Sequence, residues 1–503
     1  MKAKILIKSL NSRHTQQLDF EDFQVKGVSS DSRQVFNDFI FVAVKGSNLN
    51  GNRFIDQAVN NGARAVVVQS SVSGPCLALT AVRQAAGRVK SSVKVPLIKV
   101  KDTRLALAKL ASEFYSNPSL KLKVVGITGT NGKTTVCYLI ESILKRKGLH
   151  PAVIGTINYR FRDRVLPAKN TTPGPIELQS LLQSMLKAKI DYVLMEASSH
   201  ALDQKRVGGI DFHSAIFTNL THDHLDYHKS FAKYFQAKAR LFKGLKSGSF
   251  AVVNNDDRYA NKIRRLTKAD LVTYGIRKKA EVVAKHIKLQ GFHTSFSVVI
   301  GNEKIDLKTN LIGRHNLYNI LASIAWAQRE GIDSSSIKSG LEDSIYIPGR
   351  MENIDFEGDF SVYVDYAHTE DALRTSLQAL RQICRKRLIV VFGCGGERDK
   401  RKRPRMGQVA SELSDLLIIT NDNPRSENSQ QIISDIKKGI KQAEFSVIPQ
   451  RLEAIKKSLL LARAGDVVLI AGKGHEDYQI INDQRIHFDD REVARECLKS
   501  LNY

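Results

Sequence analysis

The residues with the clearest chemical potential lie in one segment, TGTNGKTT, from Thr128 to Thr135. The apolar run 122–127 before it predicts a buried strand, and apolar residues at helical spacing over 136–144 predict a helix that Gly148 ends. A strand, a glycine loop, a Gly-Lys-Thr triplet and a helix are typical of a phosphate-binding loop. In such a loop, backbone N–H groups and the helix N-terminus favour the charge of bound phosphates.

Two side chains of this loop have predicted roles. Lys133 is placed to reach the β- and γ-phosphates of a nucleotide, and Thr134 to offer its hydroxyl to Mg²⁺. The commonest spacing, G-x-x-x-x-G-K-[ST], would put a glycine where this chain has Ile127, whereas the glycines here are Gly126 and Gly129. The alternative is an ordinary glycine-rich turn between a strand and a helix, but the context and the Lys-Thr pair favour the phosphate loop.

A second candidate group follows two later apolar strands. The run 192–195 ends on Glu196, and a carboxylate at the end of a buried strand is where nucleotide hydrolases hold Mg²⁺. The next strand, 214–218, runs into a loop with His222, His224 and His228. Zinc is one interpretation, but no partner set with zinc spacing accompanies these histidines. One imidazole that binds a second Mg²⁺ or steadies the γ-phosphate fits better.

The last third of the chain repeats one pattern three times. The apolar runs 388–392, 416–420 and 467–471 each predict a buried parallel strand, and each ends in a polar loop. Because ligands of open α/β sheets bind outside the carboxyl ends of the strands, we expect the three loops to converge. They offer Arg398, Arg425 and Glu476, which suit a zwitterionic ligand such as an amino acid. The alternative is three unrelated surface loops.

Composition limits the class of protein. The net charge of +26, from 77 basic and 51 acidic residues among 503, is compatible with nucleic-acid binding. The basic residues are spread along the chain without an aromatic-interleaved RNA motif, so small polyanionic substrates explain the charge equally well. The densest basic run, 398–405, is predicted to be half site and half solvated turn. We expect no membrane span, no signal peptide, and five reduced cysteines in a cytoplasmic protein.

The length and these elements predict an α/β protein of three domains. The first spans 1–104, the second spans 105–343 with a phosphate-loop ATPase-like parallel sheet, and the third spans 344–503 and is Rossmann-like. A break at 347–350 is interpreted as the linker to the third domain. In the first domain, Ser32 and Arg33 lie in a polar loop that, taken alone, indicates an ordinary turn. The helix expected over 234–242 carries Lys238, which the pattern alone places on the surface.

At these residues the chain resembles the Mur ligases of peptidoglycan synthesis, nearly from end to end. Segment 128–135 is similar to their ATP loop, which accounts for its glycine spacing. Four further segments are similar to signatures of the members that use diaminopimelate: Asp31-Ser32-Arg33, Asn170-Thr171-Thr172, Ser198 with Gln204 and Arg206, and Asp422-Asn423-Pro424-Arg425. One departure is Asp38, where the family usually has a glycine.

The resemblance implies an ATP-dependent ligase that adds meso-diaminopimelate to the D-glutamate of UDP-N-acetylmuramoyl-L-alanyl-D-glutamate. ATP would phosphorylate the γ-carboxylate of the D-glutamate, and the incoming amine would attack the acyl phosphate. The protein would mostly position the reactants and neutralise charge. The implied partners are these substrates, with Mg²⁺ as cofactor and without nucleic acid or membrane, and the implied state is a monomer.

The resemblance also implies residue roles. The catalytic set would be Lys133, Glu196, His224 and Lys238; Thr134 and Glu196 would hold one Mg²⁺, and His224 and Lys238, carbamylated by CO₂, a second. ATP would be held by Gly129, Thr130, Asn131, Gly132, Lys133, Thr134, Thr135, Asn316, Arg350 and Asp365. The UDP-linked dipeptide would be held by Ser32, Asn170, Thr171, Thr172, Ser198, Gln204 and Arg206. Diaminopimelate would be held by Arg398, Asp422, Asn423, Pro424, Arg425, Gly472 and Glu476.

Within this set, Arg425 is predicted to hold the second carboxylate of diaminopimelate, which L-lysine lacks, unless it pairs with a nearby acid such as Glu427. Two other classes of protein stay open. Folylpolyglutamate synthetases are related ligases with a similar ATP loop, but they lack a UDP-binding first domain of this kind. Their amino-acid site should not carry Asp-Asn-Pro-Arg. A nucleic-acid-binding ATPase without ligase activity would use the basic charge.

Overall fold

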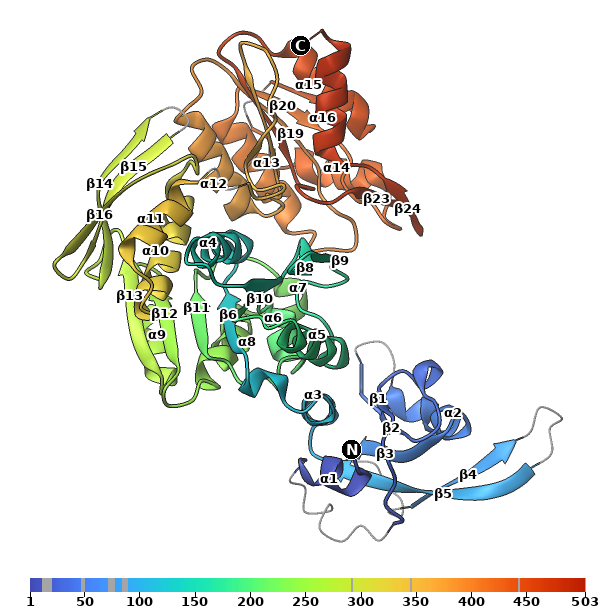
Figure 1. Cartoon of the computed structure of the whole chain (residues 1–503). Coiled ribbons are helices and arrows are strands. Elements are labelled where there is room, and N and C mark those ends of the chain that lie inside the picture. Colours follow the sequence, from blue (N-terminus) through green and yellow to red (C-terminus); the bar gives the residue numbers. More distant parts are fainter. Residues whose placement is uncertain are drawn as a thin grey trace. The chain divides into compact units, whose positions relative to one another are not determined.

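The computed structural model describes residues 1–10, 20–46, 50–70, 77–83, 89–290, 293–343, 346–441 and 444–502 (Figure 1). They form two compact units. The first comprises 1–126 and 150–214, and the second comprises 127–149 and 215–503. Cys76 lies outside the described residues.

The first unit opens with a five-stranded sheet in the order β1-β2-β3-β5-β4. Its strands are β1 (Gly27–Ser29), β2 (Phe39–Val42), β3 (Ala63–Gln69), β4 (Leu77–Arg83) and β5 (Val89–Val100). Successive side chains of a strand point to opposite faces, so Ile40 and Val42 pack with helices α1 (Ala3–Lys8) and α3 (Thr103–Phe114), and Phe41 packs with α2 (Ile55–Asn60). Short 3₁₀ turns lie at η2 (Ser32–Gln34), η3 (Gly51–Phe54) and η4 (Pro118–Leu120).

The largest sheet has eleven strands in the order β16-β15-β14-β13-β12-β11-β6-β10-β7-β8-β9. They are β6 (Lys123–Thr128), β7 (Pro151–Ile154), β8 (Asn158–Phe161), β9 (Arg164–Pro167), β10 (Tyr192–Glu196), β11 (Ser214–Phe217), β12 (Phe250–Asn254), β13 (Asp270–Gly275), β14 (Val282–Gln290), β15 (His293–Ile300) and β16 (Glu303–Thr309). Strands β12 to β14 pair in parallel, whereas β14 to β16 pair antiparallel.

Helices connect the strands of this sheet. They are α4 (Lys133–Arg146), α5 (Pro175–Lys187), α6 (Ser199–Asp203), α7 (Leu225–His228), α8 (Phe231–Lys243), α9 (Ala260–Leu266), α10 (Arg314–Arg329) and α11 (Ser334–Glu342). Helix α10 is buried along most of its length and contacts α4, α11 and β12 to β14. Its small side chains, such as Ala322 and Ala325, permit this close packing on several faces, and Trp326 is fully buried.

The C-terminal part holds a six-stranded sheet in the order β17-β18-β22-β19-β20-β21, parallel from β18 to β21. The strands are β17 (Glu352–Asn353), β18 (Ser361–Asp365), β19 (Leu388–Phe392), β20 (Leu416–Ile419), β21 (Glu444–Val447) and β22 (Val467–Ala471), followed by the hairpin β23 (Tyr478–Ile481) and β24 (Gln484–His487). Both faces are covered, because Val390 packs with α12 (Glu370–Arg381), α13 (Lys402–Leu413) and α14 (Ser429–Lys437), and Val391 with α15 (Arg451–Leu461) and α16 (Asp490–Ser500).

The structure confirms the predicted strands at 122–127, 192–195, 214–218, 388–392, 416–420 and 467–471 within one or two residues. It contradicts the prediction that 398–405 ends in a solvated turn, because α13 begins at Lys402 and the Arg403 side chain is fully buried. The domain boundaries stay predictions, and position 104 falls inside α3. No helix in the described part of the chain is long and apolar enough to cross a membrane.

Candidate functional site

The phosphate loop depends on two glycines. Gly132 has a φ of 90°, which L-residues rarely adopt, and a Cβ there would collide with the Asn319 side chain. A Cβ at Gly129 would collide with the Thr218 hydroxyl. Only glycine therefore allows the backbone of this loop to run between β11 and α10.

Side chains at the end of β11 fix the same loop. The Thr218 hydroxyl donates to the Asn131 carbonyl at 2.6 Å, and the Asn131 N–H donates to the Asn219 side chain at 3.0 Å. Lys133 Nζ donates to the carbonyls of Gly129 at 3.1 Å and Thr130 at 2.9 Å. The ammonium is thus held over the loop, where it would meet bound phosphates.

Lys238 is buried against this loop, which contradicts the surface position expected from its helix. Its side chain is 2% exposed, its Nζ donates to the Gly129 carbonyl at 2.7 Å, and it lies 4.7 Å from the centre of the Tyr234 ring. Burial, reinforced by the charge of Lys133, holds the pKa of Lys238 well below its usual value. The site therefore favours the neutral amine.

His224 lies beside Asp223, with Nε2 3.2 Å from the carboxylate. Burial opposes ionisation of Asp223, but the charges of His224, His368 and Lys402 outweigh it and lower the pKa of Asp223 to about 2. An ionised carboxylate therefore faces the predicted magnesium histidine, and the sequence analysis did not single it out.

Asp371 is a second residue that the sequence analysis missed. Its carboxylate accepts from Asn131 Nδ2 at 2.8 Å and from the Thr221 hydroxyl at 3.0 Å, so the first turn of α12 is bonded to the phosphate loop. Thr369 caps α12, and an acidic first turn after such a cap is a recognisable pattern. That pattern predicts a helix start but cannot name a partner 240 residues away.

A pocket of about 380 Å³ contains two of the predicted nucleotide residues, Asn316 and Arg350. The Asn316 side chain donates to the Ile312 carbonyl and accepts from Asn319. Arg350 donates to the Thr134 hydroxyl at 3.2 Å and stacks 4.5 Å above the Tyr366 ring. Through Arg350, one lining residue of the pocket therefore contacts the start of α4 directly after the phosphate loop.

The third predicted nucleotide residue, Asp365, is at the end of β18 and is buried. Its carboxylate accepts from the N–H groups of Met351 and Ala367 and from the Ser376 hydroxyl, at 2.8 to 3.0 Å. These bonds join β18 to the residue after Arg350 and to α12. Asp365 thus holds in place Met351, which lines the pocket.

In the first unit, Glu196 ends β10 as predicted and is 1% exposed. Its two oxygens accept from the N–H and the hydroxyl of Thr156, both at 2.9 Å. A Cβ at Gly155 would lie 2.5 Å from Glu196 Oε1, so that glycine makes room for the carboxylate. A carboxylate fixed in this way is a suitable oxygen ligand for a hard cation.

Most of the predicted dipeptide residues gather at the same strand end. The Thr172 hydroxyl donates to the Glu196 carbonyl at 2.6 Å, and Thr171 and Thr156 share a hydroxyl contact at 3.1 Å. Arg206 donates to Gln204 and to the Thr172 carbonyl, while the Ser198 N–H donates to the Thr172 hydroxyl.

Two of the residues predicted to hold the dipeptide, Asn170 and Ser32, bond to residues outside this strand-end group. The Asn170 carbonyl accepts from the Tyr159 hydroxyl. Ser32, in η2, donates to Gln57 of α2 at 2.7 Å. Asp38, the departure noted above, has a φ of 67°, which explains why a glycine suits that position.

The three C-terminal loops converge, which excludes the alternative of unrelated surface loops. Asn423 donates to Glu476 at 2.9 Å, and the Arg425 guanidinium donates to the Gly396 carbonyl at 2.7 Å. Burial, followed by the charge of Asp422, raises the pKa of Glu476. One site thus combines a guanidinium with a buried carboxylate.

The structure also shows where the remaining residues of the predicted diaminopimelate set lie. Glu427 pairs with Arg403 at 2.8 Å, so the structure does not show the Arg425–Glu427 pair. A Cβ at Gly472, where φ is 120°, would lie 2.7 Å from Asp422 Oδ2. Pro424 follows Asn423 inside the same loop, whereas Arg398 is exposed.

Buried charged residues hold this site, Arg451 and Asp490 from outside the loops and Lys473 from within the third loop, and the sequence analysis named none of them. Arg451 pairs with Asp490 at 2.7 Å, both fully buried, and also donates to the carbonyls of Asn421 and Ala471. It therefore joins the ends of β20 and β22. Lys473 Nζ donates to Asn423 and lies 3.4 Å from Glu476.

Three family models match the chain in succession. They are the Mur ligase family catalytic domain over residues 24–115, the Mur ligase middle domain over 127–327, and the Mur ligase glutamate ligase domain over 349–474. The chain belongs to the Mur ligase family. Its three-domain α/β fold and parallel-dominated central sheet agree with that assignment.

Within the family, the chain is similar over nearly its whole length to ligases of one kind. The chain is 42% identical over 483 residues to the UDP-N-acetylmuramoyl-L-alanyl-D-glutamate–2,6-diaminopimelate ligase 1 of Clostridium acetobutylicum. These aligned residues cover 95% of each of the two chains. It is 39% identical over 503 residues, or 100% of each chain, to the diaminopimelate ligase of Clostridium botulinum. A solved structure of such a ligase has a TM-score of 0.67 and 32% identity over 97% of this chain and 98% of its own.

Proposed function

We propose that this chain is a cytoplasmic, ATP-dependent ligase that adds meso-diaminopimelate to the D-glutamate of UDP-N-acetylmuramoyl-L-alanyl-D-glutamate. Relatives that are 39–42% identical to this chain are named for this activity, and the similarity covers nearly their whole length. The observation that supports the proposal is that a glycine loop of phosphate-binding type and a converging group of loops with Arg425 and Glu476 occur in one compact unit. A nucleotide hydrolase needs only the first of these.

In this function, Lys133 and the loop N–H groups hold the phosphates of ATP, and Arg350 and Asn316 line the pocket for the rest of the nucleotide. The γ-phosphoryl group passes to the substrate's γ-carboxylate, and the amine of diaminopimelate attacks the acyl phosphate. Phosphate then leaves from the tetrahedral intermediate. The chain contributes mainly positioning and charge neutralisation.

The residues fit Mg²⁺. No group of three or more His, Cys, Asp or Glu that could hold a metal ion occurs among the described residues. Magnesium usually takes only one or two protein carboxylates and completes its shell with water and substrate phosphates, so the fixed carboxylate of Glu196 is a sufficient protein ligand. Bound there, Mg²⁺ would neutralise phosphate charge during transfer.

Lys238 fits the carbamate that the family resemblance implies. A neutral amine is the form that attacks CO₂, forming an N–C bond and releasing a proton, and the buried site disfavours the ammonium. The product is an anion beside the phosphate loop, where a cation would compete with Mg²⁺. His224, flanked by the ionised Asp223, would serve the same second metal.

The UDP-linked dipeptide is assigned to the strand-end group of Thr171, Thr172, Ser198, Gln204 and Arg206, with Asn170 and Ser32. The four cysteines that the structure describes form no disulfide, which agrees with the reducing compartment that we propose. We propose a monomer that needs neither nucleic acid nor membrane.

Phosphate release tests the function directly. ATP and Mg²⁺ are supplied with the UDP-linked dipeptide and diaminopimelate, with folate and glutamate, or with DNA or RNA. We expect release only with the first pair, together with a product heavier by one diaminopimelate residue in mass spectrometry. Release with folate, or release stimulated by nucleic acid without the dipeptide, would refute the proposal.

A further inference from the structure

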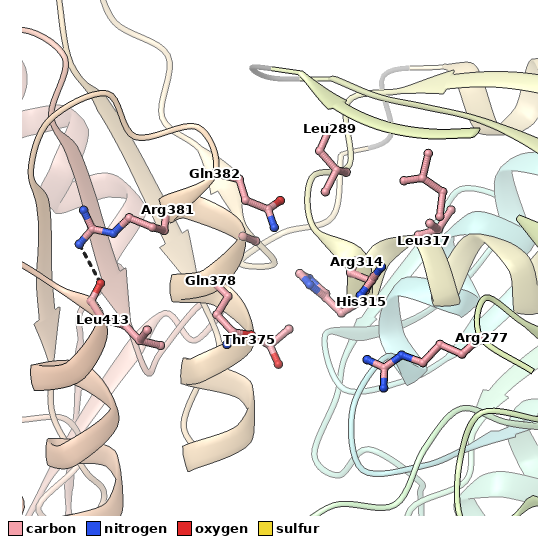
Figure 2. Close-up of a pocket in the computed structure, with 12 residues that line it drawn as sticks. Arg277, Leu289, Arg314, His315, Leu317, Thr375, Gln378, Arg381, Gln382 and Leu413 are labelled. Carbon is pink, nitrogen blue, oxygen red and sulfur yellow. Dashed lines mark hydrogen bonds between the residues drawn. The ribbon is translucent and has the colours of Figure 1, made fainter. Parts of the chain in front are cut away.

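A second cavity, of about 750 Å³, lies within the second unit and shares no described lining residue with the pocket of Asn316 and Arg350 (Figure 2). It opens between the start of α10, strand β14 and the outer face of α12. Ligand pockets for small organic molecules commonly have about 300–1,000 Å³. None of the roles proposed above uses it.

The cavity is positively charged. Arg277, Arg314 and Arg381 line it, and no aspartate or glutamate does so among the described residues. Arg381 is already engaged, since it donates to Asp415 at 2.9 Å and to the Leu413 carbonyl at 2.9 Å. Figure 2 shows it turned toward Leu413, whereas Arg277 and Arg314 lie on the opposite side. Two exposed guanidinium groups thus remain for a ligand.

The carboxylate that accepts from the Arg277 backbone is saturated. Asp256 accepts from the N–H groups of Ile276, Arg277 and Lys278 and from the Tyr318 hydroxyl, all at 2.7 to 2.9 Å. Its charge is therefore spread over local backbone donors and a phenol. A phosphate with several acceptor oxygens would be a stronger partner for the two guanidinium groups.

The opposite wall suits a flat organic body with polar edges. Thr375, Gln378 and Gln382 project from α12 toward the cavity (Figure 2). An amide side chain both donates and accepts, which is what the edge of a nucleobase requires. Leu289 and Leu317 add apolar surface for its faces.

His315 supplies an unfilled hydrogen-bonding group at the same place. It lines the cavity, and its Nδ1 is buried without a hydrogen-bond partner among the described residues. Burial, against the attraction of Asp365, lowers the pKa of His315 to about 4, so the ring is neutral at pH 7. Buried polar atoms of this kind usually have a partner, and a ligand would provide one only by displacing the groups that cover Nδ1.

We propose that this cavity is a second, regulatory nucleotide site, in which Arg277 and Arg314 hold the phosphate of a nucleoside phosphate and α12 contacts its base. A ligand bound in this cavity would change the binding of the catalytic nucleotide. His315 directly precedes Asn316, and Thr375 donates to the carbonyl of Asp371, which itself bonds Asn131 of the phosphate loop. A ligand that joins α10 to α12 would therefore restrain both walls of the catalytic site.

Calorimetry on the full chain tests binding, with Mg²⁺ and excess AMP-PNP added first to fill the catalytic site. The probes are AMP, GMP, CMP and UMP, with inorganic phosphate alongside. We expect at least one nucleotide to bind, and Arg277→Ala and Arg314→Ala each to weaken it by roughly tenfold or more, since a hydrogen bond to a charged group is lost. Gln378→Glu should weaken it as well, and Lys278→Ala, a neighbouring charge outside the cavity, should not.

Three results would overturn the proposal: no binding of any nucleotide, binding that the arginine variants leave unchanged, or phosphate binding as tightly as the nucleotides. Thermal melting of each variant separates a lost site from a lost fold, and Gln378→Glu changes an exposed side chain that folding does not need. The regulatory part is tested by the KM for ATP, which the bound nucleotide should change by at least about twofold in the wild type and not in Arg314→Ala. An unchanged KM in the wild type would refute that part.

Discussion

The phosphate loop and the proposed amino-acid site differ in how their residues are brought together. The loop is one contiguous segment, in which Lys133 bonds carbonyls three and four residues away and glycines provide the turn, and distant side chains add single hydrogen bonds to Asn131. The amino-acid site joins three loops from separate strands, and the residues that hold them, Arg451 with Asp490 and Arg403, come from three helices. The groups that would bind phosphate are therefore adjacent in the chain, whereas the groups of the composite site are brought together by buried ion pairs between distant residues.

This difference has an energetic consequence. Removing one partner of a buried ion pair leaves an uncompensated charge, which costs about 3–5 kcal/mol. A loop held by backbone bonds can lose a side chain that contacts ligand with little effect on folding. Variants in the two regions should thus divide into those that lose chemistry and those that lose structure.

Lys133→Ala should give the largest loss of activity. The charge that meets the phosphates disappears, so kcat/KM should fall by about a thousandfold, as when a main electrostatic stabiliser is deleted. Phosphate release measures the loss, and circular dichroism should show a normal fold. Lys145→Ala, at the exposed far end of the same helix, is the control. Near-normal turnover in folded Lys133→Ala would mean that the loop does not bind phosphate.

Arg451→Met should cost about 3–5 kcal/mol of unfolding free energy, measured in urea, because Asp490 stays buried without its partner. The KM for diaminopimelate should rise while the KM for ATP stays within about twofold. The double variant Arg451→Met with Asp490→Leu should regain much of the stability, since it removes both charges. Equal increases of both KM values in the single variant would show that the two regions are not independent.

These cases show what sequence reasoning could and could not predict. The strand ends at Phe392, Ile419 and Ala471 follow from apolar runs that stop abruptly, and the loop glycines follow from a local motif. Arg403 was missed because its charge-rich surroundings suggested solvent, although it shares a buried helix face with Met406. The partners of buried charges lie tens of residues away, and no local pattern encodes such a distance.

Lys238 is another buried charged residue that the local pattern placed on the surface, and it gives the next prediction. Lys238→Ala should lower kcat by about a hundredfold, comparable to the loss of one electrostatic stabiliser, and acetate or formate should restore part of it by supplying a carboxylate. Lys238→Arg should stay inactive because it keeps a positive charge. Lys243→Ala, exposed on the last turn of the same helix, is the control. An active Lys238→Arg enzyme would contradict the carbamate.

Arg425→Ala should have the smallest effect and the most specific one. Diaminopimelate and L-lysine share the reacting end, and only the former carries a second carboxylate at the far end. Arg425 is fixed for that group: its backbone bonds Ile480, its Nη1 donates to Gly396, and Glu427 is occupied by Arg403. A hydrogen bond to a charged group contributes about 1.5–3 kcal/mol, so its loss should reduce discrimination at least roughly tenfold.

The measurement is kcat/KM for both amino acids, in the wild type and in Arg425→Ala. The wild type should prefer diaminopimelate, and the variant should lose most of that preference through the KM for diaminopimelate. The KM for ATP should not change, because Arg425 and the phosphate loop are supported by different residues. Arg398→Ala, an exposed arginine of the neighbouring loop, tests whether any positive charge suffices. If it reduces the preference as much as Arg425→Ala, recognition depends on the net charge of the site and not on the orientation of one guanidinium.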